Sequence, residues 1–406
     1  MDRIKALHVS TQSGKSGLLL RESQHAFLYD PALLVNGDRR QEISLTMPLR
    51  SDPWRTHPML PVFQTFLPEG YLKDRIESKF GKVLKMDDMA LLALSGSNAI
   101  GRLRVSTHPE PSTEATGVES LAEIMSDQHS RDLFEYLSDK YLIGTAIAGV
   151  QPKVVVPVAQ ESLAHDSSKK SLGDRSTLRA RQVIVKIDGG EYPGVTENEY
   201  HCLSIARNTG LIEVPDFSLS QDFRRLAIER FDRNESGEYL GFEDMVSLQG
   251  KVNADKYQGS YEMVAATIRQ TCSAPHLHAS LQAYYASVVL AVVLKNGDAH
   301  LKNFGMRYTD PTTDDCRLSP IYDQVCTTAY IPKDLLALKL NKTRSWPNRE
   351  TLEKFGRDSC AVSSPGQVIE QVQDAVAQYR PQIQGPAWGA LRAIFSARPG
   401  ELSGSS

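Results

Sequence analysis

A polar, charged segment at residues 295–305, KNGDAHLKNFG, directly follows the most apolar stretch of the chain, residues 281–294. Asp298 and Asn303 are five positions apart, which is the D-x-x-x-x-N spacing of a protein-kinase catalytic loop. In that chemistry the Asp accepts the proton of the attacking hydroxyl, and the Asn oxygen holds Mg²⁺ on the phosphates. A loop anchored to a buried helix is also a rigid support for reactive groups. The segment therefore predicts phosphoryl transfer.

Three further groups supply the other parts that such a site requires. Asp323 stands 25 positions after Asp298 and predicts a second carboxylate for the metal. Lys186 lies inside a β-branched apolar stretch, as does the lysine of the third strand of a kinase. The small-residue turn at residues 148–153 suits a close approach of backbone to phosphate. Each feature is common in unrelated chains, and it is their order along the chain that predicts a kinase.

Strands and a buried helix must hold these groups in place. Alternating or apolar runs predict strands, and apolar residues at helical spacing predict helices. The predicted strands are residues 4–10, 17–20, 26–29, 43–48, 154–158 and 182–187, and the predicted helices are residues 63–80, 118–139, 197–209 and 281–294. We expect a linker at residues 106–117, a polar insertion at residues 160–181 and a mainly helical chain beyond residue 245. A GKS sequence at residues 14–16 is predicted to be a hairpin turn, because Val9 replaces a glycine that a P-loop needs.

Composition excludes several classes of protein. The 406 residues carry 46 Lys and Arg against 49 Asp and Glu, a net charge of −3, which argues against a free-standing nucleic-acid coat. The five cysteines are scattered and form no CxxC pair, so neither a disulfide framework nor a structural zinc site is indicated. The start of the sequence lacks the apolar core of a signal peptide, and the apolar runs are too short to span a bilayer. We expect a soluble protein of a reducing compartment.

Taken together, the motifs resemble those of the HipA family, the serine/threonine kinase toxins of bacterial HipBA toxin–antitoxin systems. The resemblance covers nearly the whole chain. The matching segments are SLTMPLR (44–50), FLPEG (66–70), IAGVQPK (147–153), VK (185–186), NEY (198–200), ERFDR (229–233), FEDM (242–245), KY (256–257), GDAHLKN (297–303) and YD (322–323).

The resemblance implies a role for each matched residue. Asp298 would be the general base, and Asn303 and Asp323 would hold Mg²⁺. Lys186 would contact the α- and β-phosphates of ATP. Backbone groups of Glu229, Arg230 and Phe231 would bind the adenine edge. The other nucleotide contacts would come from Ala148, Gly149, Val150, Gln151, Pro152, Lys153, His300, Leu301, Lys302 and Tyr322.

The resemblance also implies an α+β fold that is two-lobed and protein-kinase-like. It would comprise a β-rich N-terminal subdomain at residues 1–108 and an ATP-binding lobe at residues 109–245. A helical lobe with the catalytic loop would follow at residues 246–395, and a disordered tail at residues 396–406.

The biology implied by the family is growth arrest and persistence. The γ-phosphate of Mg-ATP would be transferred to a Ser or Thr of a protein, which in the family is glutamyl-tRNA synthetase. A HipB-like helix-turn-helix antitoxin dimer would neutralise the toxin and bring it onto operator DNA, where the pair represses transcription. The location would be the bacterial cytoplasm, with association to the nucleoid through the antitoxin.

One departure from the family concerns autoregulation. In characterised members a Ser seven residues before the phosphate-loop lysine is autophosphorylated, which switches the kinase off. Here that position is Ala146, and the adjacent Thr145 would point in a different direction. Pro152 also removes a backbone donor from the loop. Two alternatives stay open: a pseudokinase that acts as a co-repressor through the antitoxin, and a small-molecule phosphotransferase with a similar D-x-x-x-x-N loop.

Overall fold

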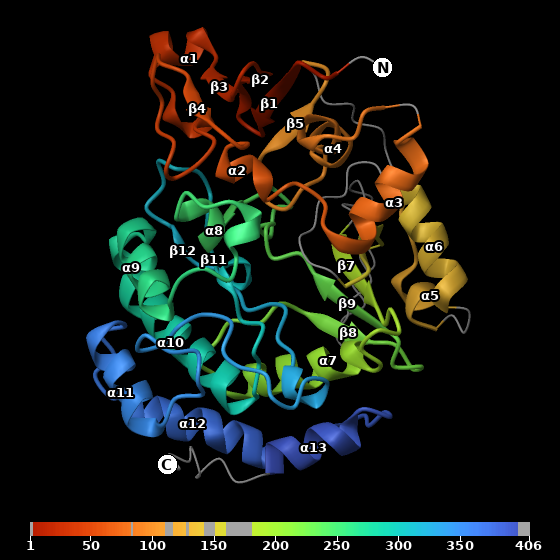
Figure 1. Cartoon of the computed structure of the whole chain (residues 1–406), viewed down its shortest axis with the longest axis vertical. Helices are drawn as coiled ribbons and strands as arrows, with labels where there is room; N and C mark the ends of the chain where they lie inside the picture. The colour runs from red at the N-terminus through yellow and green to blue at the C-terminus, as the bar shows by residue number, and fades with distance from the viewer. Residues whose placement is uncertain are drawn as a thin grey trace, which may run out of the picture.

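The structure, a computed structural model, describes residues 3–82, 84–109, 117–126, 130–141, 151–159 and 181–396. Figure 1 shows a β-rich N-terminal part at the top, a mixed middle part and a row of helices at the bottom. Each of these parts has its own cluster of buried apolar side chains. No helix within the described ranges has the length and apolar character needed to cross a membrane.

The N-terminal part is built on an antiparallel sheet with the strand order β4-β3-β2-β1-β5. Its strands are β1 (Ala6–Thr11), β2 (Gly14–Arg21), β3 (His25–Tyr29), β4 (Trp54–Thr56) and β5 (Arg104–Ser106). Its helices are α1 (Pro31–Asn36), α2 (Pro61–Gln64), α3 (Gly70–Phe80) and α4 (Asp88–Ser95). The first three predicted strands are confirmed, and so is the hairpin at the GKS sequence, which opens β2 directly after the turn from β1.

Two predictions in this part are wrong. Residues 43–48 form turns and not a strand. The adjacent residues Ile43 and Ser44 are both buried, and the Ser44 hydroxyl and the Leu45 amide bond to Glu243 and not to a neighbouring strand. The predicted helix at residues 63–80 is interrupted: α2 ends at Gln64 and α3 begins at Gly70. Pro68 lies between them, and a proline inside a helix removes a hydrogen bond and clashes with the preceding turn.

The middle part contains a second antiparallel sheet with the order β6-β7-β9-β8. Its elements are β6 (Lys153–Val158), β7 (Arg181–Ile187), β8 (Phe217–Leu219), β9 (Arg225–Glu229), α5 (Leu121–Ser126), α6 (Ser130–Tyr141) and α7 (Val195–Asn208). Both predicted strands and the predicted helix at residues 197–209 are confirmed to within about two residues. Of the predicted insertion, residues 160–180 lie outside the described part, and Arg181 is the first residue of β7. Most of the predicted linker, residues 110–116, also lies outside it.

The C-terminal part is mainly helical, as predicted. Its helices are α8 (Met245–Leu248), α9 (Tyr261–Thr271), α10 (Leu277–Val293), α11 (Arg349–Asp358), α12 (Pro365–Gln378) and α13 (Trp388–Ser396). The sequence did not predict its small sheet of β10 (Gly241–Asp244), β11 (Gly305–Tyr308) and β12 (Arg317–Leu318). The short 3₁₀ turns are η1 (Arg39–Gln41), η2 (Asn253–Asp255), η3 (Ala274–His276), η4 (Leu301–Asn303) and η5 (Thr327–Ala329). Of the tail, residues 397–406 lie outside the described part.

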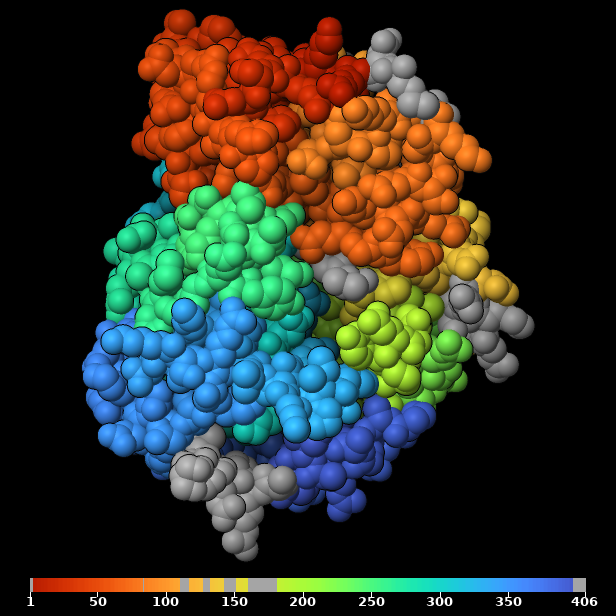
Figure 2. Space-filling view, in the orientation of Figure 1, coloured from red at the N-terminus to blue at the C-terminus, as the bar shows by residue number. Residues whose placement is uncertain are grey.

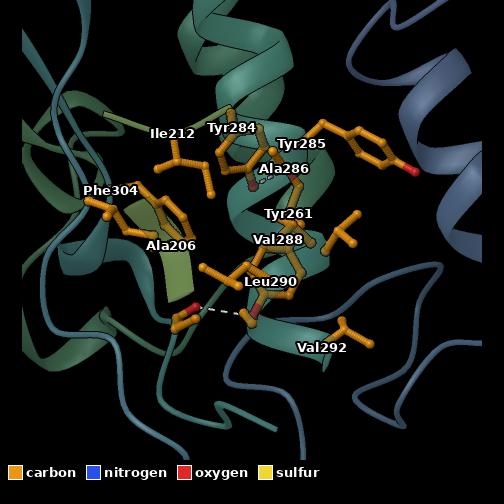
Figure 3. Close-up of a cluster of buried hydrophobic side chains, with 14 of the residues drawn as sticks. Ala206, Ile212, Tyr261, Tyr284, Tyr285, Ala286, Val288, Leu290, Val292 and Phe304 are labelled. Carbon is orange, nitrogen blue, oxygen red and sulfur yellow. Dashed lines mark hydrogen bonds between the residues drawn. The ribbon is translucent and has the colours of Figure 1, made fainter. Parts of the chain in front are cut away.

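Helix α10 is the centre of the largest core and the support of the loop that follows it. The helix is apolar on nearly all sides, which is typical of a helix surrounded by protein. Figure 3 shows Tyr284, Val288 and Leu290 of this helix packed among Tyr261 and other buried side chains. The Tyr261 hydroxyl donates to the carbonyl of Ala299 at 3.1 Å, so the buried core directly fixes the loop after α10.

The N-terminal part is joined to the rest of the molecule by buried polar contacts. Figure 2 shows it resting against the middle and C-terminal parts. Arg230, beyond β9, donates to the carbonyl of Ala99 at 2.9 Å and pairs with Asp232. Asp232 in turn accepts from the Gly101 amide at 2.6 Å. We call Arg230 and Asp232 with these partners the joint cluster.

Candidate active site

The β6-β7-β9-β8 sheet carries two lysines to one face. Side chains alternate between the faces of a strand, and Val154 and Val185 point into the apolar core under α5 and α6. Lys153 and Lys186 therefore point to the opposite face, where they line a cleft of about 620 Å³. They are direct cross-strand partners, so two like charges lie side by side. Such a pair is unfavourable unless anions compensate it.

Two carboxylates compensate Lys186. Its ammonium lies 2.6 and 2.8 Å from the two oxygens of Glu199, on α7, and also contacts Asp323. Burial favours the neutral amine, yet Asp323 and Glu199 together hold the pKa of Lys186 above its usual range. This is the strand-lysine to helix-glutamate ion pair that a kinase needs in place for phosphoryl transfer.

Lys153 is the second cation of the cleft. Among the described residues its ammonium makes no hydrogen bond or ion pair, although the side chain is buried. Burial lowers its pKa, an effect that the charge of Asp323 opposes. A buried ammonium that faces a cleft is suited to hold an anionic ligand such as a phosphate.

Asp323 is held ionised at the open side of this charge cluster. Burial alone would raise its pKa, but the neighbouring ammonium groups of Lys153 and Lys186 hold the pKa of Asp323 well below its usual range. Its side chain is 33% exposed, compared with 4% for Lys186, so the carboxylate still faces the cleft. The backbone at Asp323 is left-handed, with φ 52°. A non-glycine residue in that region is strained and is often found at functional sites.

The catalytic loop places Asp298 in the same cleft. One oxygen of Asp298 accepts from the Tyr257 hydroxyl at 2.7 Å, and the Asp298 amide donates to the Asn296 side chain at 3.0 Å. These bonds fix the carboxylate and the backbone of Asp298, and within the described residues no hydrogen bond is made to the other carboxylate oxygen. Gly297 allows the close packing, since a Cβ there would lie 2.5 Å from the carbonyl oxygen of Leu335.

Asn303 and His300 form the turn that ends this loop. The side-chain oxygen of Asn303 accepts from the His300 amide at 3.0 Å, which closes η4. The imidazole of His300 is buried, and burial lowers its pKa to about 4, so it is neutral at physiological pH. Leu301, also predicted to contact nucleotide, is instead fully buried in the large apolar core and does not line the cleft.

Lys302 connects the loop to the N-terminal part. Its ammonium lies 2.7 Å from Glu69, just before α3, and 3.1 Å from the side-chain oxygen of Asn253. Its carbonyl accepts from the Tyr322 hydroxyl at 2.6 Å. The FLPEG segment thus supplies a carboxylate to the cleft, a role that its sequence did not reveal.

Aromatic and aliphatic side chains form an apolar platform at the β9 end of the cleft. Phe231 and Tyr322 stack with ring centroids 5.5 Å apart and an interplanar angle of 23°. Phe242 packs edge-on against both rings, while Ile184 and Ile228 line the same cleft. Flat apolar walls of this kind suit a nucleobase.

The segment Glu229–Phe231 meets the prediction only in part. Glu229 and Phe231 line the cleft, but the Arg230 side chain points into the joint cluster. The amides of Glu229 and Arg230 already donate to the carbonyls of Asp216 (2.7 Å) and Gln182 (3.1 Å). These two amides are therefore engaged within the protein, and the Arg230 side chain takes part in the joint cluster.

The phosphate loop is described only at its end. Gln151 lines the cleft, and the carbonyl of Pro152 accepts from the Ile187 amide at 3.0 Å, which continues the pairing of β6 with β7. The remaining predicted residues of the loop lie outside the described part: Ala148, Gly149, Val150 and the switch positions Thr145 and Ala146.

The donor set fits Mg²⁺. Asp323 and Asn303 both line the cleft and offer carboxylate and amide oxygens beside two ammonium groups. Mg²⁺ is typically held by one or two such groups together with substrate phosphates. Within the described ranges, no group of three or more His, Cys, Asp or Glu side chains is arranged to hold a metal alone.

Comparison with known families follows the same division of the chain. A family model described as the HipA N-terminal domain matches residues 7–106, and one described as the HipA-like C-terminal domain matches residues 145–380, more than half of the chain. This chain belongs to the HipA family.

Relatives of this HipA-family chain carry kinase names. A Sinorhizobium fredii protein named "Putative kinase Y4dM" is 26% identical over 386 residues, which cover 89% of this chain and 86% of that protein. A "Putative kinase" of Haemophilus influenzae is 31% identical over 228 residues, covering 52% of this chain and 62% of that protein. The family, the fold and these names together support a kinase.

A solved structure shows the fold. The chain is similar to one from the Shewanella oneidensis MR-1 toxin–antitoxin complex of HipA, HipB and operator DNA. The TM-score is 0.66 at 17% identity, and the match covers 96% of this chain and 95% of the other. The predicted α+β, two-lobed, kinase-like HipA fold is confirmed.

Sequence reasoning missed three residues of this HipA-family site. Glu199 was recognised as part of a motif but not as the partner of Lys186, although an acidic residue on the helix after a strand lysine is a readable signal. Tyr257 and Glu69 also stand in matched motifs, but their contacts with Asp298 and Lys302 join distant parts of the chain. Spacing alone does not predict contacts of that kind.

Proposed function

We propose that the chain is a protein kinase that transfers the γ-phosphate of Mg-ATP to a Ser or Thr hydroxyl of a protein. One observation carries the proposal. A single cleft is lined by the Lys186–Glu199 ion pair, Asp298, Asn303 and Asp323. Their order in the chain could arise by chance, but their convergence on one cleft supports the role proposed for each group.

Each residue has a defined task in this proposal. The free oxygen of Asp298 accepts the proton of the attacking hydroxyl, while Tyr257 holds the carboxylate in position. Lys153 and Lys186 bind the phosphates as cations, and Glu199 keeps Lys186 in place. Asn303 and Asp323 would hold Mg²⁺, which when bound neutralises charge on the phosphates.

The proposal extends to a target and a partner. By family resemblance the protein substrate is glutamyl-tRNA synthetase, and its phosphorylation arrests growth and leads to persistence. A HipB-like antitoxin dimer would neutralise the kinase and bring it onto operator DNA. The fold shared with the HipA chain of a HipA–HipB–DNA complex supports this assignment, and a net charge of −3 favours DNA contact through the partner.

A labelled-ATP assay tests the proposal. Purified chain, Mg²⁺ and glutamyl-tRNA synthetase with tRNA are incubated with ATP labelled at the γ-phosphate, and phosphoamino acids are identified on the labelled protein. We expect phosphoserine or phosphothreonine on the synthetase, lost in Asp298→Asn and kept in Asp374→Asn, a matched change at an exposed residue of α12.

The other outcomes are equally informative. Label on the chain alone would reject the synthetase as target and keep the kinase. ATP binding without transfer to any protein would reject the kinase and favour the pseudokinase co-repressor. Transfer to a small molecule alone would favour the phosphotransferase.

A further inference from the structure

Exposed apolar side chains gather at the mouth of the cleft. Tyr192, Tyr257, Ile331 and Leu335 all line it, and their exposed fractions are 41%, 38%, 46% and 50%. We call these four residues the apolar rim. Single exposed apolar residues are ordinary, but several gathered at one cleft mark a binding surface.

Two residues of the apolar rim, Tyr257 and Leu335, belong to segments that contact the catalytic loop. Tyr257 bonds directly to Asp298, at 2.7 Å. The backbone of Leu335 lies close to Gly297, the residue before Asp298, because a Cβ at Gly297 would lie 2.5 Å from the Leu335 carbonyl oxygen. A hydroxyl that reaches Asp298 therefore comes close to Tyr257 and to the segment that carries Leu335.

The segment that carries Ile331 and Leu335 is held in place by the catalytic loop. The Thr327 hydroxyl accepts from the Gly297 amide at 2.7 Å, and the Thr327 carbonyl accepts from the Ile331 amide at 2.9 Å. The Trp346 indole donates to the carbonyl of Asp334 at 3.0 Å. At the far end of the rim, Tyr192 packs edge-on against Tyr330 with centroids 5.4 Å apart. A platform fixed in this way binds a chain without first having to be ordered.

We propose that the apolar rim binds the segment of the protein substrate around the acceptor hydroxyl and selects an apolar residue close to that Ser or Thr. The proposal rests on the proposed kinase function. Its occupant follows from the position of Asp298: a protein segment that delivers a hydroxyl to this base lies beside Tyr257, which bonds to Asp298, and enters the cleft that Leu335 also lines. When an apolar residue of the substrate covers these exposed apolar side chains, apolar surface on both partners is removed from water, which favours binding.

A peptide library with one Ser or Thr per peptide and one fixed neighbouring residue tests the proposal, with Mg-ATP as donor. We expect peptides with an apolar residue within about three positions of the acceptor to be favoured about tenfold in kcat/KM, mainly through KM. Leu335→Ser should remove this preference and leave the KM for ATP unchanged. Leu34→Ser, the same change at an exposed leucine of α1, should keep it.

A second variant tests whether a new peptide preference can be introduced. Leu335→Asp should favour peptides with Lys or Arg near the acceptor, because the new carboxylate then faces that position. Phosphorylated peptides without an apolar preference, or a preference unchanged in Leu335→Ser, would overturn the inference and leave the kinase standing.

If only folded proteins are phosphorylated, the Leu335→Ser and Leu34→Ser variants are compared on such a protein. Equal rates would overturn the inference there as well. ATP binding without transfer to any peptide or protein would instead reject the kinase itself, and the inference with it.

Discussion

Two buried charge clusters in this molecule differ in how completely the surrounding protein encloses them. In the joint cluster, Arg230 and Asp232 have side chains 0% and 1% exposed, and their bonds run to Asn98, Ala99 and Gly101. In the cleft cluster, Lys186 and Glu199 are equally buried, but Asp323 is 33% exposed. Lys153 in the cleft makes no ion pair among the described residues.

This difference distinguishes a charge cluster with a structural role from one with a functional role. A charge pair enclosed by its own hydrogen bonds fixes how two parts of a chain join. A cluster that is compensated on one side and open on the other keeps its charges for a ligand. Arg230 stands in the ERFDR motif, yet it belongs to the first kind. Lys153, Lys186 and Asp323 belong to the second.

The largest expected effect is on transfer in Asp323→Asn. We expect phosphoryl transfer to fall on the order of 10³-fold, because the charge that would hold Mg²⁺ is lost. The free energy of unfolding should fall by about 1–2 kcal/mol, less than in Asp232→Asn, since Lys186 keeps Glu199 and the lost charge is partly exposed. Transfer rate and denaturant unfolding are measured on the same preparation. A variant that transfers normally would remove Asp323 from the active site.

Asp232→Asn should lower the stability of the protein and leave phosphoryl transfer nearly unchanged. The Arg230 guanidinium would stay buried without a compensating charge, so the free energy of unfolding should fall by about 3 kcal/mol. Transfer per folded molecule, measured below the unfolding transition, should stay within about twofold of the wild type. An equally stable variant would show that the joint cluster does not hold the N-terminal part in place.

Glu243 also joins the N-terminal part to the rest of the molecule, and the pH dependence of stability tests this contact. Burial raises its pKa, although the Ser44 hydroxyl, the Leu45 amide and the Tyr308 hydroxyl all donate to it and oppose the rise. Its stabilising contribution is therefore fully present below the ordinary pKa of 4.5 and is lost as the pH rises through the higher folded-state value. Glu243→Gln keeps the shape and does not titrate.

We therefore expect Glu243→Gln to gain stability relative to the wild type as the pH rises above 4.5. The gain should approach about 1.4 kcal/mol per pH unit until the folded-state pKa is reached. Denaturant unfolding of both proteins from pH 4 to pH 8 measures it. A difference that stays constant over this range would contradict the raised pKa.

The smallest expected effect is in Lys153→Met. Removing an ammonium whose charge is disfavoured by burial should raise the melting temperature. The affinity for Mg-ATP, from equilibrium titration, should fall about tenfold, because one phosphate cation is lost. A variant that melts lower and binds ATP as well as the wild type would place Lys153 among the structural charges.

The sequence predicted the features of these clusters that depend on local pattern, but not those that depend on contacts between residues far apart in the chain. The β-branched apolar stretch around Lys186 correctly predicted its strand, and the order of motifs grouped Lys186 with Asp298, Asn303 and Asp323, which line the same cleft. The buried helix α10 was evident from its apolar residues alone.

Contacts between distant segments were not predictable in this way. Residues 43–48 alternate like a strand, but their polar groups bond to Glu243, about 200 positions away. Arg230 has the motif context of a nucleotide contact, yet its partners Asn98 and Ala99 lie in another part of the molecule. Local pattern does not encode which distant group a side chain meets.

A single side-by-side assay tests the central contrast most directly. Wild type, Asp323→Asn and Asp232→Asn are compared for γ-phosphate transfer from Mg-ATP and for their melting temperatures. We predict that the two variants differ in opposite senses: Asp232→Asn is the less stable of the two yet transfers phosphate, and Asp323→Asn is the more stable yet does not. Loss of both properties in both variants would contradict the division into an open catalytic cluster and a closed structural one.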